Sequence, residues 1–145
     1  MSTDVKTLAQ ITTDQSAVPA GWDLRAIVND DNITYLAYNT QAKEAVVVDP
    51  VREDLPTLLA ETKKLTGYRF LAVVDSHTHA DHVSSAADLA TAVGAPLVQH
   101  ERSPSRRIHL RVSQDTHLPS QAAPLYILTT PGHTPDSLTV MWGPF

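Results

Sequence analysis

The sequence contains no cysteine, and this absence removes several kinds of chemistry at once. Without thiols the chain forms no disulfide, builds no thiolate metal site and offers no cysteine nucleophile. The absence also fits a reducing compartment, because disulfides mark oxidising ones. No apolar run approaches the roughly 20 residues that a membrane-spanning helix needs. The polar first 21 residues lack the basic and apolar regions of a secretory signal, so we expect a cytoplasmic location.

Positive charge is also scarce, since 11 Lys and Arg stand against 16 Asp and Glu and give a formal net charge of −5. An acidic chain has little attraction for nucleic acids or anionic membranes, and we expect neither as a partner. Hydrophobic residues make up 42% of the 145 residues, which is ordinary for a globular protein of one domain. A homo-oligomer is compatible with this composition.

Alternating strand and helix patterns predict a mixed α/β fold. Residues 1–20 are polar and aperiodic, so we expect a flexible N-terminal arm ahead of one domain over residues 21–145. Residues 101–120 are expected to be irregular. Strand, helix and strand in alternation favour parallel pairing. The expected strands are Leu24–Val28, Ile33–Tyr38, Glu44–Asp49, Arg69–Asp75, Leu97–His100, Leu125–Thr129 and Ser137–Trp142, and the expected helices cover about 53–66 and 84–93.

The strongest functional signal is the histidine-rich segment 76–82, Ser-His-Thr-His-Ala-Asp-His, which follows a buried strand. Side chains two positions apart on extended backbone face the same side, so His77 and His79 can bind one ion. Asp81 and His82 are expected in the first turn of the next helix, aimed at a neighbouring position. Imidazoles with a carboxylate suit Zn²⁺, Fe²⁺ or Mn²⁺. The alternative is a polar loop with solvent-facing histidines, which so dense a pattern disfavours.

His133 is the natural additional ligand. It follows the Leu125–Thr129 strand, and Pro131 and Gly132 precede it. Proline restricts the backbone and glycine allows many conformations, so this pair lets the backbone approach a site closely. Taken alone, a histidine at a strand end is more often a satisfied surface or core residue. Together with the first segment, metal ligation becomes the favoured interpretation.

Both segments resemble the metallo-β-lactamase superfamily, whose mark is H-x-H-x-D-H followed at a distance by G-H. Residues 79–83 (His-Ala-Asp-His-Val) and 130–135 (Thr-Pro-Gly-His-Thr-Pro) resemble the branch of glyoxalase II-type thioesterases and persulfide dioxygenases. Residues 45–50 (Ala-Val-Val-Val-Asp-Pro) and 94–96 (Gly-Ala-Pro) are also similar to this branch. The resemblance extends over about residues 24–142, nearly the whole chain.

The resemblance implies a metallo-β-lactamase-like αββα sandwich and a metal centre. His77, His79 and His133 would surround the first metal position, while Asp81 and His82 would serve the second in two-metal members. In iron-dependent persulfide dioxygenases, the residues matching His77 and His133 hold one Fe²⁺ with a later aspartate. The implied cofactor is therefore Fe²⁺ or Zn²⁺, and Asp81 is expected to be the catalytic carboxylate.

The implied function is that of a metal-dependent enzyme with a small-molecule substrate. The Ala80-Asp81-His82 variant favours a persulfide dioxygenase acting on a glutathione-type persulfide, and a glyoxalase II-like thioester hydrolase is the alternative. The family's T-G-D motif does not follow the Ser137–Trp142 strand, so we expect the N-terminal portion of a longer domain. This departure supports a third interpretation, a non-catalytic metal-binding remnant or a half-domain that needs a partner chain. In either case we expect a poor catalyst and a poorly soluble monomer.

Three weaker features leave alternatives open. Asp75 either orients a ligand histidine or forms a turn at a strand end. Four arginines either hold an anionic substrate or lie on a solvated loop, which is their commoner role. Four aromatic residues are expected to pack in the core or at its edge rather than stack on a substrate. The arginines are Arg102, Arg106, Arg107 and Arg111, and the aromatic residues are Trp22, Tyr35, Tyr38 and Trp142.

Overall fold

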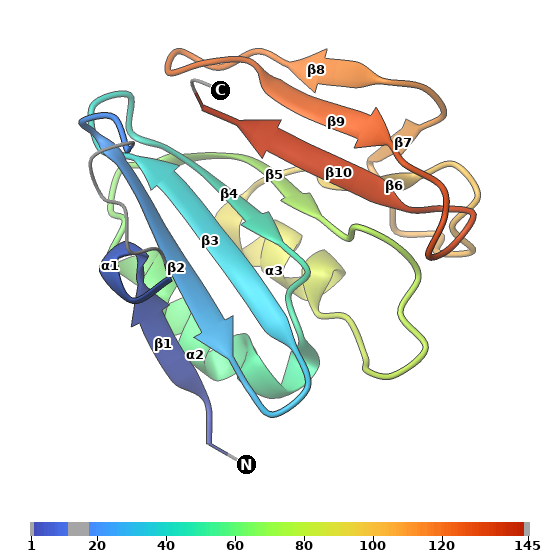
Figure 1. Cartoon of the computed structure of the whole chain (residues 1–145), viewed down its shortest axis with the longest axis horizontal. Helices are drawn as coiled ribbons and strands as arrows, with labels where there is room; N and C mark the ends of the chain where they lie inside the picture. The colour runs from blue at the N-terminus through green and yellow to red at the C-terminus, as the bar shows by residue number, and fades with distance from the viewer. Residues whose placement is uncertain (1, 12–17, 144–145) are drawn as a thin grey trace.

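The computed structural model describes residues 2–11 and 18–143, which form two β-sheets packed face to face with helices outside the larger sheet (Figure 1). The strands are β1 (Asp4–Thr7), β2 (Trp22–Val28), β3 (Ile33–Asn39), β4 (Glu44–Val48), β5 (Arg69–Val74), β6 (Leu97–His100), β7 (Leu110–Val112), β8 (Thr116–Leu118), β9 (Leu125–Thr129) and β10 (Leu138–Trp142). The helices are α1 (Leu8–Ile11), the 3-10 helix η1 (Arg52–Asp54), α2 (Leu55–Lys63) and α3 (Ala86–Val93).

The larger sheet contains strands β1 to β7 in sequence order, and the smaller sheet has the order β10-β9-β8. Strands β1 to β4 pair antiparallel, whereas β4 to β7 pair parallel. Helices α2 and α3 form the crossovers between the parallel strands, which confirms the predicted strand–helix–strand pattern. Residues 29–32 form the turn between β2 and β3, because Val28 pairs with Ile33.

The alternation of side chains along β4 and β5 divides the core into two halves. Val47 and Val73 belong to the cluster that packs beneath the helices, together with Leu58 and Leu89. Their neighbours along the two strands, including Val46, belong to the cluster between the two sheets. Successive residues of a strand point to opposite faces, so an uninterrupted run of valines fills both halves at once.

The N-terminal residues differ from the expected flexible arm. Residues Asp4–Thr7 pair antiparallel with β2, and Val5 packs against the core beneath the helices. The hydroxyl of Thr3 donates a 2.6 Å hydrogen bond to Asp54, which ties this edge strand to η1. A short, half-polar edge strand shows little periodicity, so its order comes from tertiary contacts. Residues 12–17 of the expected arm lie outside the described residues.

The segment over residues 101–120 also differs from the expected irregular loop. It contains β7, which pairs parallel with β6, and β8, which pairs antiparallel with β9. Each of these strands has only three residues, too few to display a period of two. Among residues 2–11 and 18–143, no helix is long and apolar enough to cross a membrane.

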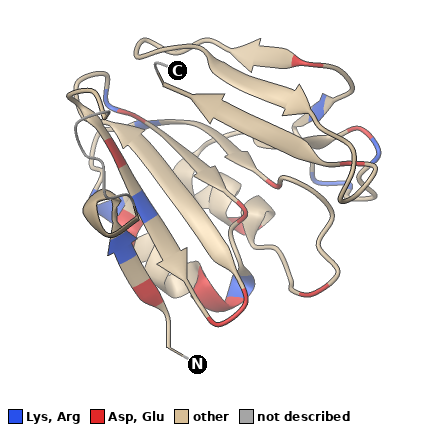
Figure 2. Ribbon diagram, in the orientation of Figure 1, with Lys and Arg blue, Asp and Glu red and all other residues tan. Residues whose placement is uncertain are grey.

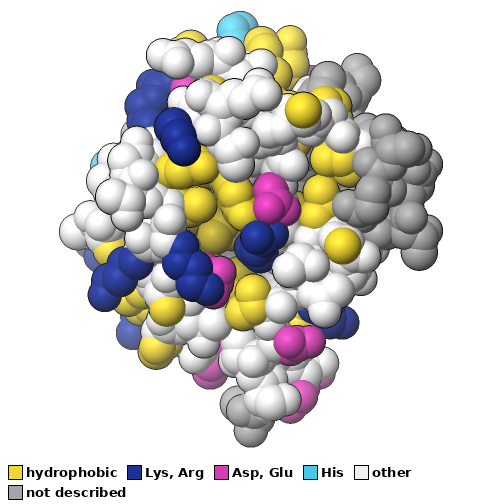
Figure 3. Space-filling model, turned by 90° about the vertical axis from the view of Figure 1, so that its left-hand side faces the viewer, with side chains coloured by type: hydrophobic (Ala, Val, Ile, Leu, Met, Phe, Trp, Pro, Cys, Tyr) yellow, Lys and Arg dark blue, Asp and Glu magenta, His cyan; other side chains and the backbone are white. Residues whose placement is uncertain are grey.

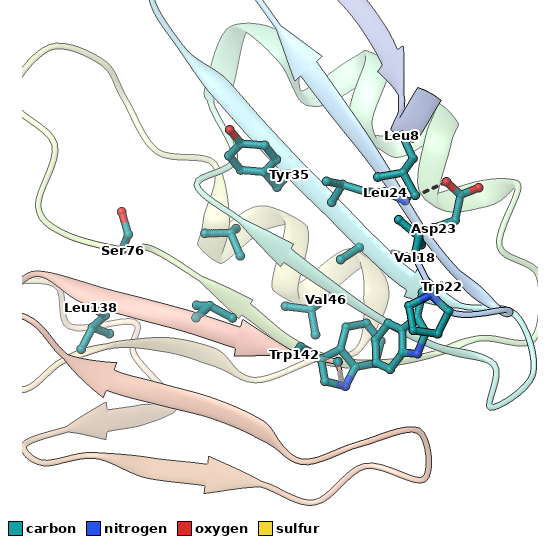
Figure 4. Close-up of a pocket in the computed structure, with 15 residues that line it drawn as sticks. Leu8, Val18, Trp22, Asp23, Leu24, Tyr35, Val46, Ser76, Leu138 and Trp142 are labelled. Atoms are coloured by element: carbon teal, nitrogen blue, oxygen red, sulfur yellow. Dashed lines mark hydrogen bonds between the residues drawn. The ribbon is translucent and has the colours of Figure 1, made fainter. Parts of the chain in front are cut away.

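The smaller sheet covers only part of the larger one and leaves an apolar groove of about 630 Å³ (Figure 4). One wall comes from β2, β3 and β4, and the other comes from β10. The rings of Trp22 and Trp142 close one end in edge-to-face contact, with 4.5 Å between their centroids. Strands β9 and β10 carry no charged side chain (Figure 2). The groove lining includes Leu24, Tyr35, Ala37, Val46, Val48, Leu138 and Val140.

Charged side chains gather instead on the helices, the connecting loops and the strands at the far edge of the larger sheet (Figure 2). On the face near β1 and α1, Lys and Arg side chains are interspersed with Asp and Glu side chains (Figure 3). Apolar side chains lie between them. This face therefore carries no extended patch of one sign.

Candidate metal centre

Two loops build the candidate site at the carboxyl end of β5. The motif loop (residues 75–85) joins β5 to α3, and the hairpin loop (residues 130–137) joins β9 to β10. The backbone amide of Leu138 donates to the carbonyl of Ser76 at 2.6 Å, which holds the start of β10 against the motif loop. Ligands of open α/β sheets bind at the carboxyl ends of strands, so this is the expected place for a functional site.

The structure brings the five residues proposed as metal ligands together. The ring centroids of His77 and His79 lie 4.1 Å apart, those of His77 and His133 lie 4.8 Å apart, and those of His79 and His82 lie 4.1 Å apart. Ligand atoms of His79, Asp81 and His82 lie within 4.8 Å of one another. All five residues line one pocket of about 530 Å³. Four imidazoles therefore form a continuous row that ends beside a carboxylate.

The surroundings of His82 indicate whether the row of four imidazoles fits a metal ion. Both of its ring nitrogens are buried and make no hydrogen bond, and the nearest carboxylate oxygen, of Asp81, lies 3.3 Å from Nδ1. A buried polar atom without a partner is costly, and such atoms in proteins are nearly always satisfied. A cation would satisfy a neutral imidazole nitrogen, so the donor set fits a metal ion.

Asp49 fixes the orientation of His79. Its Oδ1 lies 3.1 Å from His79 Nε2 and accepts the Ser76 amide at 2.7 Å, while Oδ2 accepts the Ser76 hydroxyl at 2.7 Å. Burial alone would raise the pKa of Asp49, but these hydrogen bonds hold that pKa below its ordinary value. Because Nε2 of His79 is engaged, Nδ1 is the nitrogen left for an ion.

The protonation of His77 and His79 responds to their neighbours in opposite ways. Burial, followed by the neighbouring His79 and His133, lowers the pKa of His77 and favours the neutral ring that a metal needs. Burial also opposes charging of His79, but the hydrogen bond and charge of Asp49 outweigh it and raise the pKa of His79. The Ser76 hydroxyl lies 2.9 Å from Nδ1 of His77, which leaves Nε2 of that ring free.

Asp81 and His82 lie in the motif loop, not in the first turn of a helix as expected. Helix α3 begins only at Ala86 because the preceding residues pair with the loop before α2. Ser84 forms an isolated antiparallel bridge with Val51, and the Arg52 amide donates to the Val83 carbonyl at 2.9 Å. These contacts keep the chain extended through Ser84, so α3 begins after it, at Ala86.

Asp75 makes no hydrogen bond to a histidine within residues 2–11 and 18–143. Its carboxylate accepts the Ser84 hydroxyl at 2.8 Å and the Gln99 amide at 2.7 Å, so it ties the end of the motif loop to β6. Burial raises the pKa of Asp75 to about 6. The role considered for Asp75, orienting a histidine, is performed by Asp49, which the sequence suggested only as the end of a strand.

Two of the four arginines bond to other residues of the protein. Arg111 donates to the carbonyls of Glu101 and Ser103, both at 3.1 Å, and Arg107 pairs with Asp88 at 3.2 Å. Arg107 also borders a second cavity that His77, His79 and His82 share. Two of the four aromatic residues, Tyr38 and Trp142, are buried as expected.

The known proteins that this chain resembles in sequence include two kinds of enzyme. No family model matches the chain. Human mitochondrial persulfide dioxygenase ETHE1 is 30% identical over 106 residues, which cover 73% of this chain and 41% of the relative. A hydroxyacylglutathione hydrolase from Anaeromyxobacter dehalogenans is 32% identical over 113 residues, which cover 77% of this chain and 42% of the relative.

Solved structures of the same kinds of protein share the fold of this chain. ETHE1 from Myxococcus xanthus superposes with a TM-score of 0.71 at 27% identity and covers 81% of this chain and 52% of its own. A metallo-β-lactamase from Staphylococcus aureus has a TM-score of 0.68 at 23% identity, over 83% of this chain and 36% of its own, which shows the fold alone. The expected metallo-β-lactamase-like fold is thus confirmed for the portion that the chain spans.

The described residues supply helices, larger sheet and smaller sheet, three of the four layers in an αββα sandwich. The chain spans about two fifths of the length of the curated relatives, at 41% and 42%. That coverage agrees with the expected match to a portion of a longer domain.

Proposed function

Since the chain belongs to the metallo-β-lactamase superfamily, in the branch of persulfide dioxygenases and hydroxyacylglutathione hydrolases, we propose that it forms the metal-binding part of a persulfide dioxygenase-like enzyme. The observation that carries this proposal is the row of four imidazoles ending at His82, whose two buried nitrogens lack hydrogen-bond partners. The similarity to the human and Myxococcus persulfide dioxygenases supports the choice of activity. The proposed substrate is a glutathione-type persulfide.

Under this proposal His77, His79 and His133 hold the first metal ion, and Asp81 with His82 serve a second position. The metal, Fe²⁺ or Zn²⁺, would supply Lewis acidity and, in the case of iron, redox capacity. Asp49 keeps the His79 ring turned so that Nδ1 faces the site.

Asp81 is the proposed catalytic carboxylate. Its side chain is 67% exposed, so it meets solvent and an incoming substrate at the pocket mouth. A carboxylate at this place can accept the proton of a thiol or a water molecule. Proton transfer requires that the two groups lie within hydrogen-bonding distance, and it does not require a buried carboxylate.

Thioester hydrolysis is the alternative activity, and the hydroxyacylglutathione hydrolase at 32% identity supports it. A non-catalytic metal-binding remnant, or a half-domain completed by another chain, is the second alternative. We further propose a cytoplasmic location, which the absence of cysteine supports.

Metal analysis of the purified chain tests the common premise of the two enzymatic proposals. We expect bound metal in the wild-type chain and its loss in a His77→Ala/His133→Ala double variant; retention of stoichiometric metal by that variant would refute the ligand assignment. Oxygen uptake with glutathione persulfide and hydrolysis of a hydroxyacylglutathione thioester then separate the activities. A metal-loaded chain with neither activity would favour the remnant.

A further inference from the structure

Asp136 is a buried carboxylate at the point where the motif loop and the hairpin loop meet. Its residue is only 7% exposed, and no feature of the sequence had marked it as functional. Each loop carries part of the row of imidazoles, with His77 and His79 on the first and His133 on the second. A group that joins the loops therefore also sets the distance between these histidines.

The two oxygens of Asp136 serve different loops. Oδ2 accepts the backbone amide of Thr78 at 3.0 Å and the hydroxyl of the same residue at 2.5 Å. Oδ1 accepts the hydroxyl of Thr134 at 2.7 Å. Thr78 lies between His77 and His79, and Thr134 follows His133 directly. One carboxylate thus binds the immediate neighbours of all three proposed ligands of the first metal position.

The remaining hydrogen bonds of the hairpin loop set its shape rather than its position. The Gly132 amide donates to the Thr134 carbonyl at 3.1 Å, and the Thr134 amide donates to the Ser137 hydroxyl at 3.1 Å. Within the described residues, only Asp136 and the Leu138–Ser76 backbone bond join the two loops by hydrogen bonds. The backbone bond lies at the base of the loops, whereas Asp136 acts next to the histidines.

Asp136 is charged under ordinary conditions. Burial would raise its pKa, but the hydrogen bonds from Thr78 and Thr134 hold that pKa below the usual value. Hydrogen bonds to an ionised acceptor are roughly twice as strong as those between neutral groups. The link between the loops is therefore made of charge-assisted hydrogen bonds.

We propose that Asp136 is a positioning residue that holds His133 against His77 and His79, so that three imidazoles from two loops reach one ion. The inference rests on the proposed metal centre, since it assigns a role toward that ion. Residues that orient metal ligands typically contribute 10- to 100-fold to metal affinity. We expect an effect of that order, about 10- to 100-fold, when the carboxylate is removed.

Zn²⁺ titration calorimetry on the full chain tests the role, with Asp136→Ala, Asp136→Asn and Thr78→Val compared with wild type. We expect Asp136→Ala to bind Zn²⁺ about 10- to 100-fold more weakly. Asp136→Asn should recover most of the affinity, because its carbonyl can accept from Thr78 and its amide can donate to Thr134. The matched control is Asp115→Ala, since Asp115 accepts the Thr129 amide at 2.8 Å in the same sheet but has no hydrogen bond to either loop.

Amide hydrogen exchange of the metal-free chain gives a readout that does not depend on binding. Loss of protection at Thr78 in Asp136→Ala, with protection retained there in Asp115→Ala, is expected. Unchanged Zn²⁺ affinity in a folded Asp136→Ala or Thr78→Val variant would overturn the inference. A wild-type chain that binds no Zn²⁺ would overturn the proposed metal site and the positioning role with it, whereas unchanged Thr78 exchange would overturn only the link between the loops.

Discussion

At the residue scale, the site depends on side chains that are held in place by groups distant in the sequence. Asp49 and His79 are 30 residues apart in the sequence. The carboxylate of Asp49 nevertheless fixes the ring of His79, and through Ser76 it also holds the motif loop. Asp49 also adopts a left-handed backbone conformation with φ of +56°. Asparagine tolerates this conformation nearly as well as aspartate. An Asp49→Asn exchange therefore keeps the backbone conformation while it removes the charge and one of the two acceptor oxygens.

We predict that Asp49→Asn weakens Zn²⁺ binding by about 10-fold, at the lower end of the effect of ligand-orienting residues. The neutral amide makes a weaker partner for His79 Nε2 and leaves the ring less firmly oriented. Calorimetric titration at constant pH measures the change, with unfolding by urea as a check on stability. Zn²⁺ affinity equal to that of the wild type would show that the charge of Asp49 is dispensable.

His82 leads to a second prediction, because its unpartnered nitrogens cost stability when no metal is bound. Replacing a buried, unsatisfied polar group with an apolar one of similar size is nearly neutral or stabilising. We predict that His82→Leu stabilises the metal-free chain by about 1 kcal/mol. Urea unfolding in the presence of a chelator is the measurement. Destabilisation by more than about 1 kcal/mol would mean that the imidazole already has a partner, such as buried water.

At the element scale, Glu44 joins the two sheets. It begins β4 and is 1% exposed, and its carboxylate accepts the Gln121 amide at 3.1 Å and a hydrogen bond from the Ser120 hydroxyl. Arg69 at the start of β5 pairs with the same carboxylate. Burial alone would raise the pKa of Glu44, but these hydrogen bonds lower it below the ordinary value.

The sign of this pKa shift predicts a loss of stability in acid. A carboxylate with a lowered pKa in the folded state stabilises the protein above its unfolded pKa, about 4.3 for glutamate. That contribution disappears as the pH falls through the lower folded pKa. We predict that Glu44→Gln costs about 1.5–3 kcal/mol at pH 7 and that the difference from wild type shrinks below about pH 4. Urea unfolding at a series of pH values gives both quantities.

The elements that the sequence predicted correctly are those with a continuous apolar run, a clear periodicity or a residue that ends them. Strands β4 and β5 have uninterrupted apolar runs, and Gly94 ends α3 with a φ of +69° as its position predicted. Strands β1, β7 and β8 have three or four residues each and take their order from neighbours. The spacing of the histidines was enough to propose them as ligands, whereas it pointed to neither Asp49 nor Asp136. Their roles depend on contacts across 27 to 58 residues.

At the scale of the whole molecule, the apolar groove between β10 and the larger sheet is the feature that most favours association with other chains. Within residues 2–11 and 18–143, seven strands face three, so part of the larger sheet is not covered by the smaller one (Figure 1). Strand β10 lies at a sheet edge and carries no charged residue or proline. Natural edge strands usually carry such residues to prevent pairing with other chains.

We predict that the chain associates at high concentration through this groove and that Tyr35→Lys reduces the association. Tyr35 lines the groove and is 37% exposed, so a lysine there adds a charge to the apolar wall. Tyr126→Lys is the matched control, because Tyr126 is 45% exposed on β9 and does not line the groove. Sedimentation velocity over a concentration series measures the association. A wild-type chain that stays monomeric throughout would contradict the prediction.

The two loops of the candidate metal centre also have a consequence for the unfolded chain. An ion held by both His77 and His133 would close a loop of roughly 56 residues, a reversible cross-link in a protein that has no cysteine. In the chain-entropy description, a covalent link across such a loop is worth about 4 kcal/mol. Loss of the ion would reopen the loop in the unfolded chain and remove that stabilisation. Metal supply would then regulate the lifetime of the folded chain as well as its chemistry.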